Sequence, residues 1–576
     1  MESFQFRSTA GANSVNQSTK YFSPKTFWNK GDKNTLVNGL SENSNKTMEL
    51  VWSNTLTYTK NINDNHNIVI LIGTEALTSS YKSLMAARNT FLIEDTDYRY
   101  LNAGETNKDN SGSGSEYSLF SIFSRINYQY KDKYYVSAII RRDGSSRFGA
   151  NNKYGYFPGI STAWRISEEA FMDNKDIISD VKLRASYGLT GNSEIGNYAF
   201  ASIYGTNIQG ASYPIAGDPN SVTQGISKEA WGNPNVKWET TTQTNLGLDV
   251  GLFDNSLFFN FDWYRKYTSD ILQRPSYPGT GGVASTPYEN VGEILNNGLE
   301  FGLNFRNTAE KKDFTYDIGL ILSGYRNEVK KLANNQFISD TYNRTEVGYP
   351  IGSFYGYTID GIFQDQQQVD NHAQQTAKAI GRWIYRDANG DGVINDNDRT
   401  FIGNPHPKFE YSLNSRLYYK NFDFNIFIQG VYGNKIAFAS KAGQSSIDFW
   451  GDYTNKSVRI LDTWTVNNRD AKLPEINILN PNGESTKVST YLLEDGSYLR
   501  VKNMELGYTL PSTILSKINV KHCRVFLNTE NILTISKYNS VNNDPEVTST
   551  DRTKGVDDIN RLALAKIYSI GFNFMF

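Results

Sequence analysis

Residues 566–576 read KIYSIGFNFMF and carry the clearest β pattern of the chain. Apolar side chains occupy every second position: Tyr568, Ile570, Phe572, Phe574 and Phe576. Because successive side chains of a strand point to opposite faces, this alternation predicts a strand with one apolar face. Segments of about ten residues with such an alternation are typical of a transmembrane β-barrel, whose strands meet lipid on one side and the lumen on the other.

The same two-residue period recurs along the chain. Leu257, Phe259, Phe261 and Trp263 share one face of a segment that follows a tight turn at 253–256. The pattern predicts about sixteen strands, near 2–11, 49–60, 65–74, 118–130, 133–142, 155–165, 181–189, 241–252, 256–267, 298–306, 314–324, 409–419, 421–432, 498–510, 523–533 and 563–576. The predicted fold class is therefore all-β, a transmembrane antiparallel β-barrel.

The connections between these segments alternate in length. Three short ones are expected at 61–64, 131–132 and 307–313, and three long ones at 190–240, 325–408 and 433–497. The alternation is a tendency, with exceptions at 143–154, 166–180 and 511–522. Outer-membrane barrels have short periplasmic turns and longer outside loops, whereas a soluble sandwich has no reason to sort its loops in this way.

Composition excludes several classes of protein. Lys plus Arg total 58 and Asp plus Glu total 60, so the net charge of -2 gives no sign of nucleic-acid binding. The mean hydropathy is -0.53, and no apolar run approaches the length of a membrane-spanning helix. The 37 Tyr and 32 Phe residues favour strands, and aromatic girdles at the bilayer interfaces explain them better than sugar stacking does.

No motif indicates catalysis, so we expect no enzyme and nominate no catalytic residue. The histidines are scattered at positions 66, 372, 406 and 522, and the single cysteine, Cys523, is interpreted as a small strand residue. The sequence has no HExxH, GxSxG, P-loop or dinucleotide fingerprint.

One loop has the spacing of a calcium site. Residues 387–398 read DANGDGVINDND and offer oxygen ligands at loop positions 1, 3, 5, 7, 9 and 12. These ligands would be Asp387, Asn389, Asp391, the Val393 carbonyl, Asn395 through water, and Asp398. The flanks look extended rather than helical, and position 12 is Asp instead of the usual Glu. We therefore expect a structural Ca²⁺ loop; the alternative is an ordinary polar turn.

Several short motifs, in order, resemble the SusC/RagA family of TonB-dependent outer-membrane transporters. They are YFPG (156–159), AWR (163–165), LRASYG (183–188), KWE (237–239), NGLE (297–300), GNP (403–405), SYLR (497–500) and NTEN (528–531). The aromatic Phe576 that closes the last strand resembles the assembly signal of outer-membrane barrels. The resemblance covers about residues 51–576.

The resemblance implies a place in the outer membrane of a Gram-negative, Bacteroidetes-type bacterium and contact with its lipid. It implies import of an oligosaccharide or a peptide, energised by TonB, with a SusD-like surface lipoprotein as partner. Family members have 22 strands around a plug. Residues 1–576 are thus expected to be the C-terminal part of a larger barrel, with signal peptide, TonB-contacting segment and plug absent from this sequence.

Two other functions stay open at this point. A passive porin or structural barrel would have the same strand pattern without a plug. An outer-membrane enzyme would need a catalytic dyad or triad at the barrel wall, and the sequence nominates none. The transported substrate, the residues that contact it and the oligomeric state are not indicated by the sequence.

Overall fold

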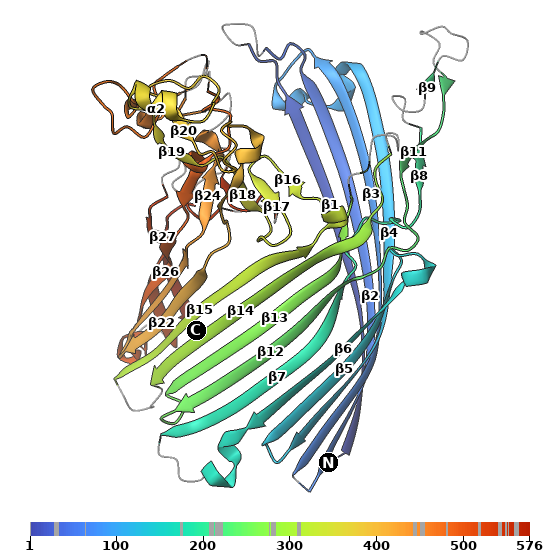
Figure 1. Cartoon of the computed structure of the whole chain (residues 1–576). Coiled ribbons are helices and arrows are strands. Elements are labelled where there is room, and N and C mark those ends of the chain that lie inside the picture. Colours follow the sequence, from blue (N-terminus) through green and yellow to red (C-terminus); the bar gives the residue numbers. More distant parts are fainter. Residues whose placement is uncertain are drawn as a thin grey trace. The chain divides into compact units, whose positions relative to one another are not determined.

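The computed structural model describes most of the 576 residues. The described ranges are 2–27, 34–63, 65–172, 177–206, 212–213, 223–275, 277, 284–307, 313–441, 446–449, 455–477, 479, 482–516, 520–538, 544–547, 550, 552–557 and 564–576. Within them the chain is mostly β-strand, and its largest element is one antiparallel sheet of 16 strands (Figure 1).

The strands of this sheet follow one another in chain order. They are β1 (Glu2–Ser23), β2 (Gly39–Ile62), β3 (His66–Phe91), β4 (Gly104–Tyr130), β5 (Tyr134–Ser145), β6 (Tyr154–Arg165), β7 (Ile178–Asn192), β12 (Glu239–Leu252), β13 (Leu257–Gln273), β14 (Glu289–Asn307), β15 (Phe314–Lys331), β22 (Phe409–Tyr419), β23 (Phe422–Tyr432), β26 (Tyr498–Thr509), β27 (His522–Ser536) and β29 (Ile567–Met575). Each predicted strand coincides with one of them. Among the described residues β1 and β29 have one neighbour each, so the sheet has two edges and is not closed into a ring.

The first four strands are longer than the sequence pattern predicts. The β1–β2 register runs without a break from Glu2↔Lys60 to Ser23↔Gly39, and the β2–β3 and β3–β4 pairs are similarly long. Residues 12–20 are largely Asn, Ser, Gln and Thr, so apolar alternation ends there while main-chain pairing continues. Pairing needs only backbone hydrogen bonds, which a polar sequence makes equally well.

The connections sort by length as predicted. The turns 63–65, 131–133, 253–256 and 420–421 are short, and Lys131, Asp132 and Lys420 have positive φ, as tight turns require. The longer connections at the same ends of the strands contain short helices, such as α3 (Ser512–Leu515). The opposite strand ends carry the long connections, among them 332–408 and 433–497. We call these the short-turn end and the long-loop end.

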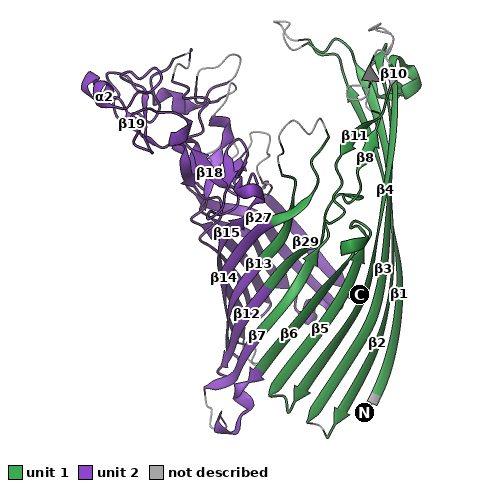
Figure 2. Ribbon diagram, turned by 45° about the vertical axis from the view of Figure 1, so that its right-hand side comes forward, with its two compact units in different colours: residues 1–163, 186–242, 268–291 green, residues 164–185, 243–267, 292–576 purple. Residues whose placement is uncertain are grey.

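The chain divides into two compact units (Figure 2). Unit 1 comprises residues 1–163, 186–242 and 268–291, and unit 2 comprises 164–185, 243–267 and 292–576. Unit 1 has its own buried cluster around Phe148, Phe157 and Trp238. In unit 2 the connection 332–408 folds into the small sheets β16-β17-β18-β21 and β19-β20, over a core that includes Trp383 and Tyr385.

The small sheets of unit 2 are built from short strands and one helix. Their bounds are β16 (Ile338–Ser339), β17 (Asn343–Thr345), β18 (Ser353–Gly356), β19 (Ile359–Ile362), α2 (Gln366–Asn371), β20 (Trp383–Tyr385), β21 (Thr400–Gly403), β24 (Lys435–Phe438), β25 (Leu493–Asp495) and β28 (Val556–Asp557). No helix in the described part of the chain is long and apolar enough to cross a membrane.

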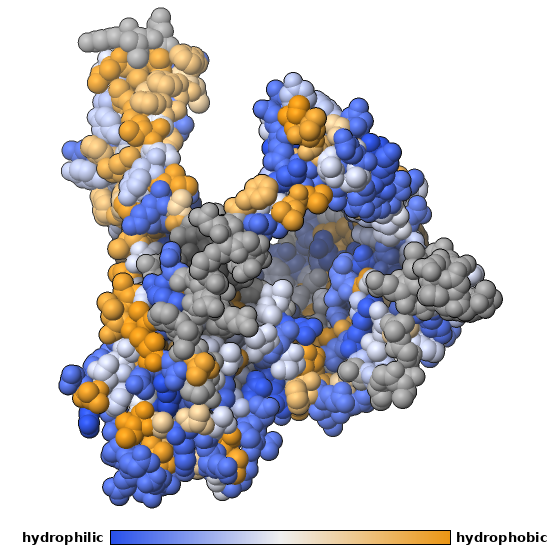
Figure 3. Space-filling model, turned by 90° about the horizontal axis from the view of Figure 1, so that it is seen from above, coloured by the Kyte–Doolittle hydropathy of each residue, from blue (hydrophilic) through white to orange (hydrophobic). Residues whose placement is uncertain are grey.

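Register gives the unit 2 strands one apolar and one polar face. A row of directly paired residues crosses six strands: Tyr316, Leu417, Phe424, Leu506, Leu527 and Ile570. Asp423, next to Phe424, and Arg524, three residues before Leu527, lie on the other face and form an ion pair. Paired residues point to the same side of a sheet, so the two faces differ along the whole set of strands. Figure 3, a view from above, shows hydrophobic patches beside hydrophilic stretches.

An aromatic row crosses the apolar face at the short-turn end. Phe314 pairs with Tyr419, Tyr419 with Phe422, and Phe422 with Tyr508. The rings of Phe422 and Tyr508 have centroids 4.6 Å apart. Aromatic residues at one level of a barrel wall mark a bilayer interface, so this row has the placement of an aromatic girdle.

Candidate functional site

The polar face of unit 2 holds charged side chains that pair across strands. Arg184 of β7 contacts Asp249 of β12 at 2.8 Å and Asp262 of β13 at 2.9 Å. Arg524 of β27 contacts Glu505 of β26 at 2.6 Å and also pairs with Asp423 of β23. These charges lie opposite the apolar row, where water or a polar solute can solvate their free edges. The polar face is thus suited to line an aqueous path.

A pocket with a cavity volume of about 440 Å³ opens near the long-loop end of this face. Most of its lining side chains lie on the polar side of their strands, including Ser323, Glu410 and Gln429. Tyr498 adds a phenol, whose oxygen accepts a hydrogen bond from Gln429 Nε2 at 3.3 Å. Hydroxyls, an amide and carboxylates beside aromatic rings can bind a polar, uncharged or cationic solute.

A buried arginine holds part of this pocket in place. Arg500 of β26 is fully buried and contacts Asp544 at 2.7 Å and Glu546, which lines the pocket, at 2.6 Å. Lys502 also pairs with Glu546, at 2.9 Å. Burial alone would raise the pKa of Asp544, but hydrogen bonds from Arg500 and the Glu546 N–H outweigh it and lower that pKa. Segment 544–547 is therefore anchored on β26.

The sequence pattern alone does not reveal this pocket. Ser323, Glu410 and Gln429 are the polar positions of predicted strands, so alternation could have assigned them to the lumen side. Glu546 lies in the connection between the predicted strands 523–533 and 563–576, which has no periodic pattern. Its placement depends on the buried Arg500, and sequence alone gave no signal for that contact.

The predicted calcium-loop residues lie together in one loop of unit 2. The Asp387 carboxylate accepts hydrogen bonds from the backbone N–H groups of Gly390 at 2.7 Å and Gly392 at 2.9 Å. The Asp398 carboxylate accepts from the N–H groups of Ala388 at 2.9 Å and Asn395 at 2.7 Å. The hydrogen bonds from Gly392 and then Gly390 lower the pKa of Asp387. Two carboxylates thus close the two ends of the loop.

The other predicted ligands also face their own loop. Asn389 Oδ1 accepts from the N–H of Asp391 at 3.0 Å, and Asp391 Oδ1 accepts from the N–H of Val393 at 2.9 Å. Asn395 Nδ2 donates to the Val393 carbonyl at 3.3 Å. Each carboxylate keeps lone pairs for a cation, because an ionised carboxylate has about four acceptor sites. Within the described ranges, however, no three His, Cys, Asp or Glu side chains converge in a metal-binding group.

Contacts outside the loop fix its position. Gln374 N–H donates to the Gly392 carbonyl at 2.8 Å, and Ile394 N–H donates to the Gln374 carbonyl at 2.9 Å. Tyr357 donates its phenol proton to Asp396 at 2.9 Å. Burial, followed by this bond to Asp396, raises the pKa of Tyr357. The loop is attached to the same core that contains Trp383.

Two of the four histidines contact neighbouring residues, and the cysteine lies on a strand. His66 contacts Tyr128 at 2.8 Å, and His406 lies 3.0 Å from the Tyr325 phenol oxygen and 2.8 Å from the Ile351 carbonyl. Cys523 is buried on β27. None of these residues belongs to a metal-binding group in the part of the chain that the structure describes.

A large antiparallel sheet with one apolar and one polar face defines the class of transmembrane β-barrel walls. The sequence profile of the family described as TonB dependent receptor-like, beta-barrel, matches residues 2–532. The chain belongs to this family. Its members are outer-membrane transporters of Gram-negative bacteria, and the expected SusC/RagA-type relationship is confirmed by the relatives.

Two curated relatives and one solved structure illustrate the relationship. TonB-dependent receptor P3 of Formosa agariphila is 32% identical over 557 residues, 95% of this chain and 53% of its own length. TonB-dependent receptor SusC of Bacteroides thetaiotaomicron is 29% identical over 80% of this chain and 44% of its own length. The structure of the RagAB peptide transporter superposes with a TM-score of 0.82 at 26% identity, covering 99% of this chain and 60% of that one. The chain spans about half the length of these curated relatives.

Proposed function

We propose that this chain is the wall of a TonB-energised importer that carries a nutrient across the outer membrane. This proposal rests on the polar face of unit 2, where charged side chains form ion pairs. The opposite face of the same strands is apolar. The paired charges Arg184–Asp249 and Arg524–Glu505 line the path that a polar nutrient would follow. In such an importer a plug fills the lumen of the barrel, and movement of the plug, driven through the TonB-contacting segment, opens the path.

We further propose a SusD-like surface lipoprotein as partner and an oligosaccharide or a peptide as cargo. The names of the relatives SusC and RagAB support this proposal. The connection 332–408 supports it physically, because a segment with its own buried core presents a rigid surface to a partner. The pocket beside Glu410 and Glu546 offers carboxylates and a phenol that suit sugar hydroxyls or peptide amides.

Uptake by the intact importer tests both proposals. Cells that lack the gene receive the wild-type whole protein, the Glu410→Gln/Glu546→Gln variant, or the control Glu116→Gln/Glu328→Gln, which removes two carboxylates elsewhere. We expect uptake of one labelled pool, oligosaccharide or peptide, to depend on the gene. The pocket variant should lower it about tenfold, as loss of hydrogen bonds to charged groups implies.

Three outcomes of the uptake experiment would each contradict a different part of the proposal. Equal uptake with and without the gene would reject import. Equal uptake by the pocket variant and the control would show that the pocket does not lie on the transport path, and the proposal of import would stand. Uptake that persists when TonB is deleted would favour a passive porin. Co-purification of a lipoprotein from the surface checks the partner.

We also propose that residues 387–398 bind a structural Ca²⁺ ion. The twelve-residue spacing supports this, together with the carboxylates of Asp387 and Asp398 at the loop ends. Asp391, Asn389 and the Val393 carbonyl would complete the oxygen shell, with Asn395 acting through water. The ion would neutralise the carboxylates and tie the loop to the core.

Calcium titration of the whole protein by calorimetry checks this site. We expect one ion per chain, lost in the Asp387→Asn/Asp391→Asn variant and kept in the control Asp97→Asn/Asp370→Asn. If the wild type and the loop variant bind the same number of ions, the loop is a polar turn closed by its own hydrogen bonds.

A further inference from the structure

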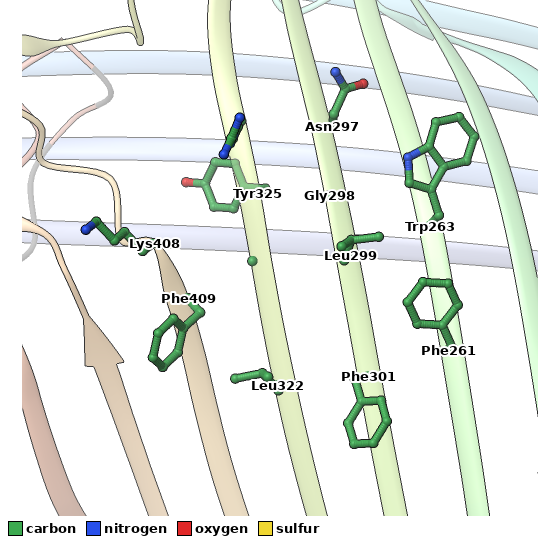
Figure 4. A pocket seen from close by; sticks show the side chains of 12 residues that line it. Phe261, Trp263, Asn297, Gly298, Leu299, Phe301, Leu322, Tyr325, Lys408 and Phe409 are labelled. Atoms are coloured by element: carbon green, nitrogen blue, oxygen red, sulfur yellow. The ribbon is translucent and has the colours of Figure 1, made fainter.

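A groove in unit 2 lies over strands β13, β14, β15 and β22 and has a cavity volume of about 770 Å³ (Figure 4). Its apolar lining consists of Phe261, Leu299, Phe301, Leu322 and Phe409. Leu299 and Leu322 are 51% and 41% exposed, and contiguous exposed apolar side chains of this kind mark a surface that another molecule or lipid covers.

Strand register places the groove on the apolar face. Phe301 pairs with Leu322, and Leu322 pairs with Tyr411, so these side chains share one side of the sheet. The rings of Phe259 and Phe301 are in contact, with centroids 4.8 Å apart, so Phe259 of β13 and the residues that alternate with it lie on that side as well. The groove therefore faces away from the ion pairs of the polar face.

A glycine deepens the groove. Gly324 pairs with Leu299, so a side chain at this position would point outward into the groove. A Cβ atom there would lie 2.8 Å from the Lys408 carbonyl oxygen and 3.6 Å from Phe409 Cβ. Leu299 and Phe409 thus border a hollow with no side chain at its floor.

Polarity changes along each strand in the same direction. Phe301 and Leu322 lie toward one end of the groove in Figure 4, and Asn297, Trp263 and Lys408 lie toward the other. The polar end is the long-loop end, because β15 runs from its short-turn end through Leu322 to Arg326 before entering the connection 332–408. At about 3.3 Å per residue, Leu322 and Arg326 are separated by about 13 Å along the strand.

Two cations mark the polar end. Arg326 and Lys408 are both exposed, and both line the groove. Among the residues that the structure describes, neither side chain has a hydrogen bond or an ion pair. Trp263, an indole at the same end, suits the level where acyl chains meet headgroups. An apolar floor below two free cations is complementary to an anionic headgroup that carries acyl chains.

We propose that this groove binds one phosphorylated, multiply acylated lipid of the outer leaflet. Its phosphate contacts Arg326 and Lys408, and its acyl chains lie over Leu322, Phe301 and Phe409. The proposal rests on the membrane placement of the barrel, in which long loops face the outside. It does not depend on what the barrel transports.

Native mass spectrometry of the whole protein in detergent tests the site. The probe is a diphosphorylated, six-chain disaccharide lipid, and its dephosphorylated counterpart is the comparison. We expect one phosphorylated lipid per wild-type chain and at least about tenfold weaker binding by Arg326→Gln/Lys408→Gln, because two charge-assisted contacts are lost. The control Arg306→Gln/Lys420→Gln removes two cations at the short-turn end of the same strands and should bind like the wild type.

Four results would overturn the proposal. Equal binding by the groove variant and the control would show that the cations do not select the lipid. Equal binding of phosphorylated and dephosphorylated lipid would show adhesion by apolar area alone. Displacement of the lipid by millimolar inorganic phosphate, or a dimer that forms only without lipid, would assign the groove to free phosphate or to a second copy of the chain.

Discussion

The strand wall and the folded connection 332–408 expose their large apolar residues very differently. Phe572 on β29 is 58% exposed, whereas Trp383 in the connection is 1% exposed. Strands that meet lipid need no protein partner for their apolar side chains, but a connection in water has to bury its own. The strands therefore suit a lipid environment and the connection suits water, and the change from one to the other occurs at the strand ends.

The largest expected effect comes from removing the core of the connection. Trp383 packs against Phe449 and Tyr491, and Gln375 Nε2 donates to its carbonyl at 2.7 Å. Trp383→Ala should destabilise this region by about 3–5 kcal/mol through lost burial and a cavity. Limited proteolysis should then cut within 340–400 while leaving the strands intact.

The matched control for that variant is Trp52→Ala. Trp52 lies on β2 and is 58% exposed, so its loss leaves no buried cavity. If Trp52→Ala and Trp383→Ala raise protease sensitivity in the connection equally, the two regions do not differ in the way proposed.

A smaller effect is expected when a charge is placed on the apolar face of a strand, and little effect when it is placed on the polar face of the same strand. Leu320 pairs with Leu413 on the apolar face, and its neighbour Ile321 pairs with Ser412 on the polar face. Leu320→Arg should cost about 2–4 kcal/mol if it lies at the bilayer midplane, whereas Ile321→Arg projects toward water. Heat-modifiable migration of the assembled barrel should fall for Leu320→Arg alone. The assignment of faces fails if both variants assemble equally.

The smallest effect concerns the pH dependence of the loop 387–398. Because the folded-state pKa of Asp387 lies below the ordinary 3.8, its contribution to stability is present above that value and is lost as the pH falls through the folded pKa. In acid, the hydrogen-exchange rates of the Gly390 and Gly392 amides should therefore rise above the values expected from the intrinsic pH dependence of exchange. The exchange rates of the β26 amides should follow that intrinsic dependence.

An Asp387→Asn variant provides the control for the pH experiment. Its side chain cannot ionise, so the extra acid-dependent exchange should disappear. Retention of the full pH dependence in this variant would assign the titration to a group other than Asp387.

Much of the fold was predictable because alternation survives wherever a strand meets lipid. Leu257 to Trp263 and Tyr568 to Phe574 carry that pattern in the sequence, and both segments form strands of the large sheet. The extension of β1 to Ser23 was not predictable, since Asn and Ser residues pair through their backbone and leave no period. The predicted ligands of residues 387–398 lie together in one loop, and their metal binding stays a prediction.

The sequence by itself determined the strands, their faces and the alternation of short and long connections, because those depend on local periodicity and turn residues. Only the tertiary structure decided which strands stand side by side and in what register. That register brings Arg326 and Lys408 to one groove at Gly324, and the ion pair with Arg500 of β26 places Glu546 in the pocket that Glu410 also lines. Such sites combine residues far apart in the chain, and hydrogen-bonded pairing, not local pattern, sets their spacing.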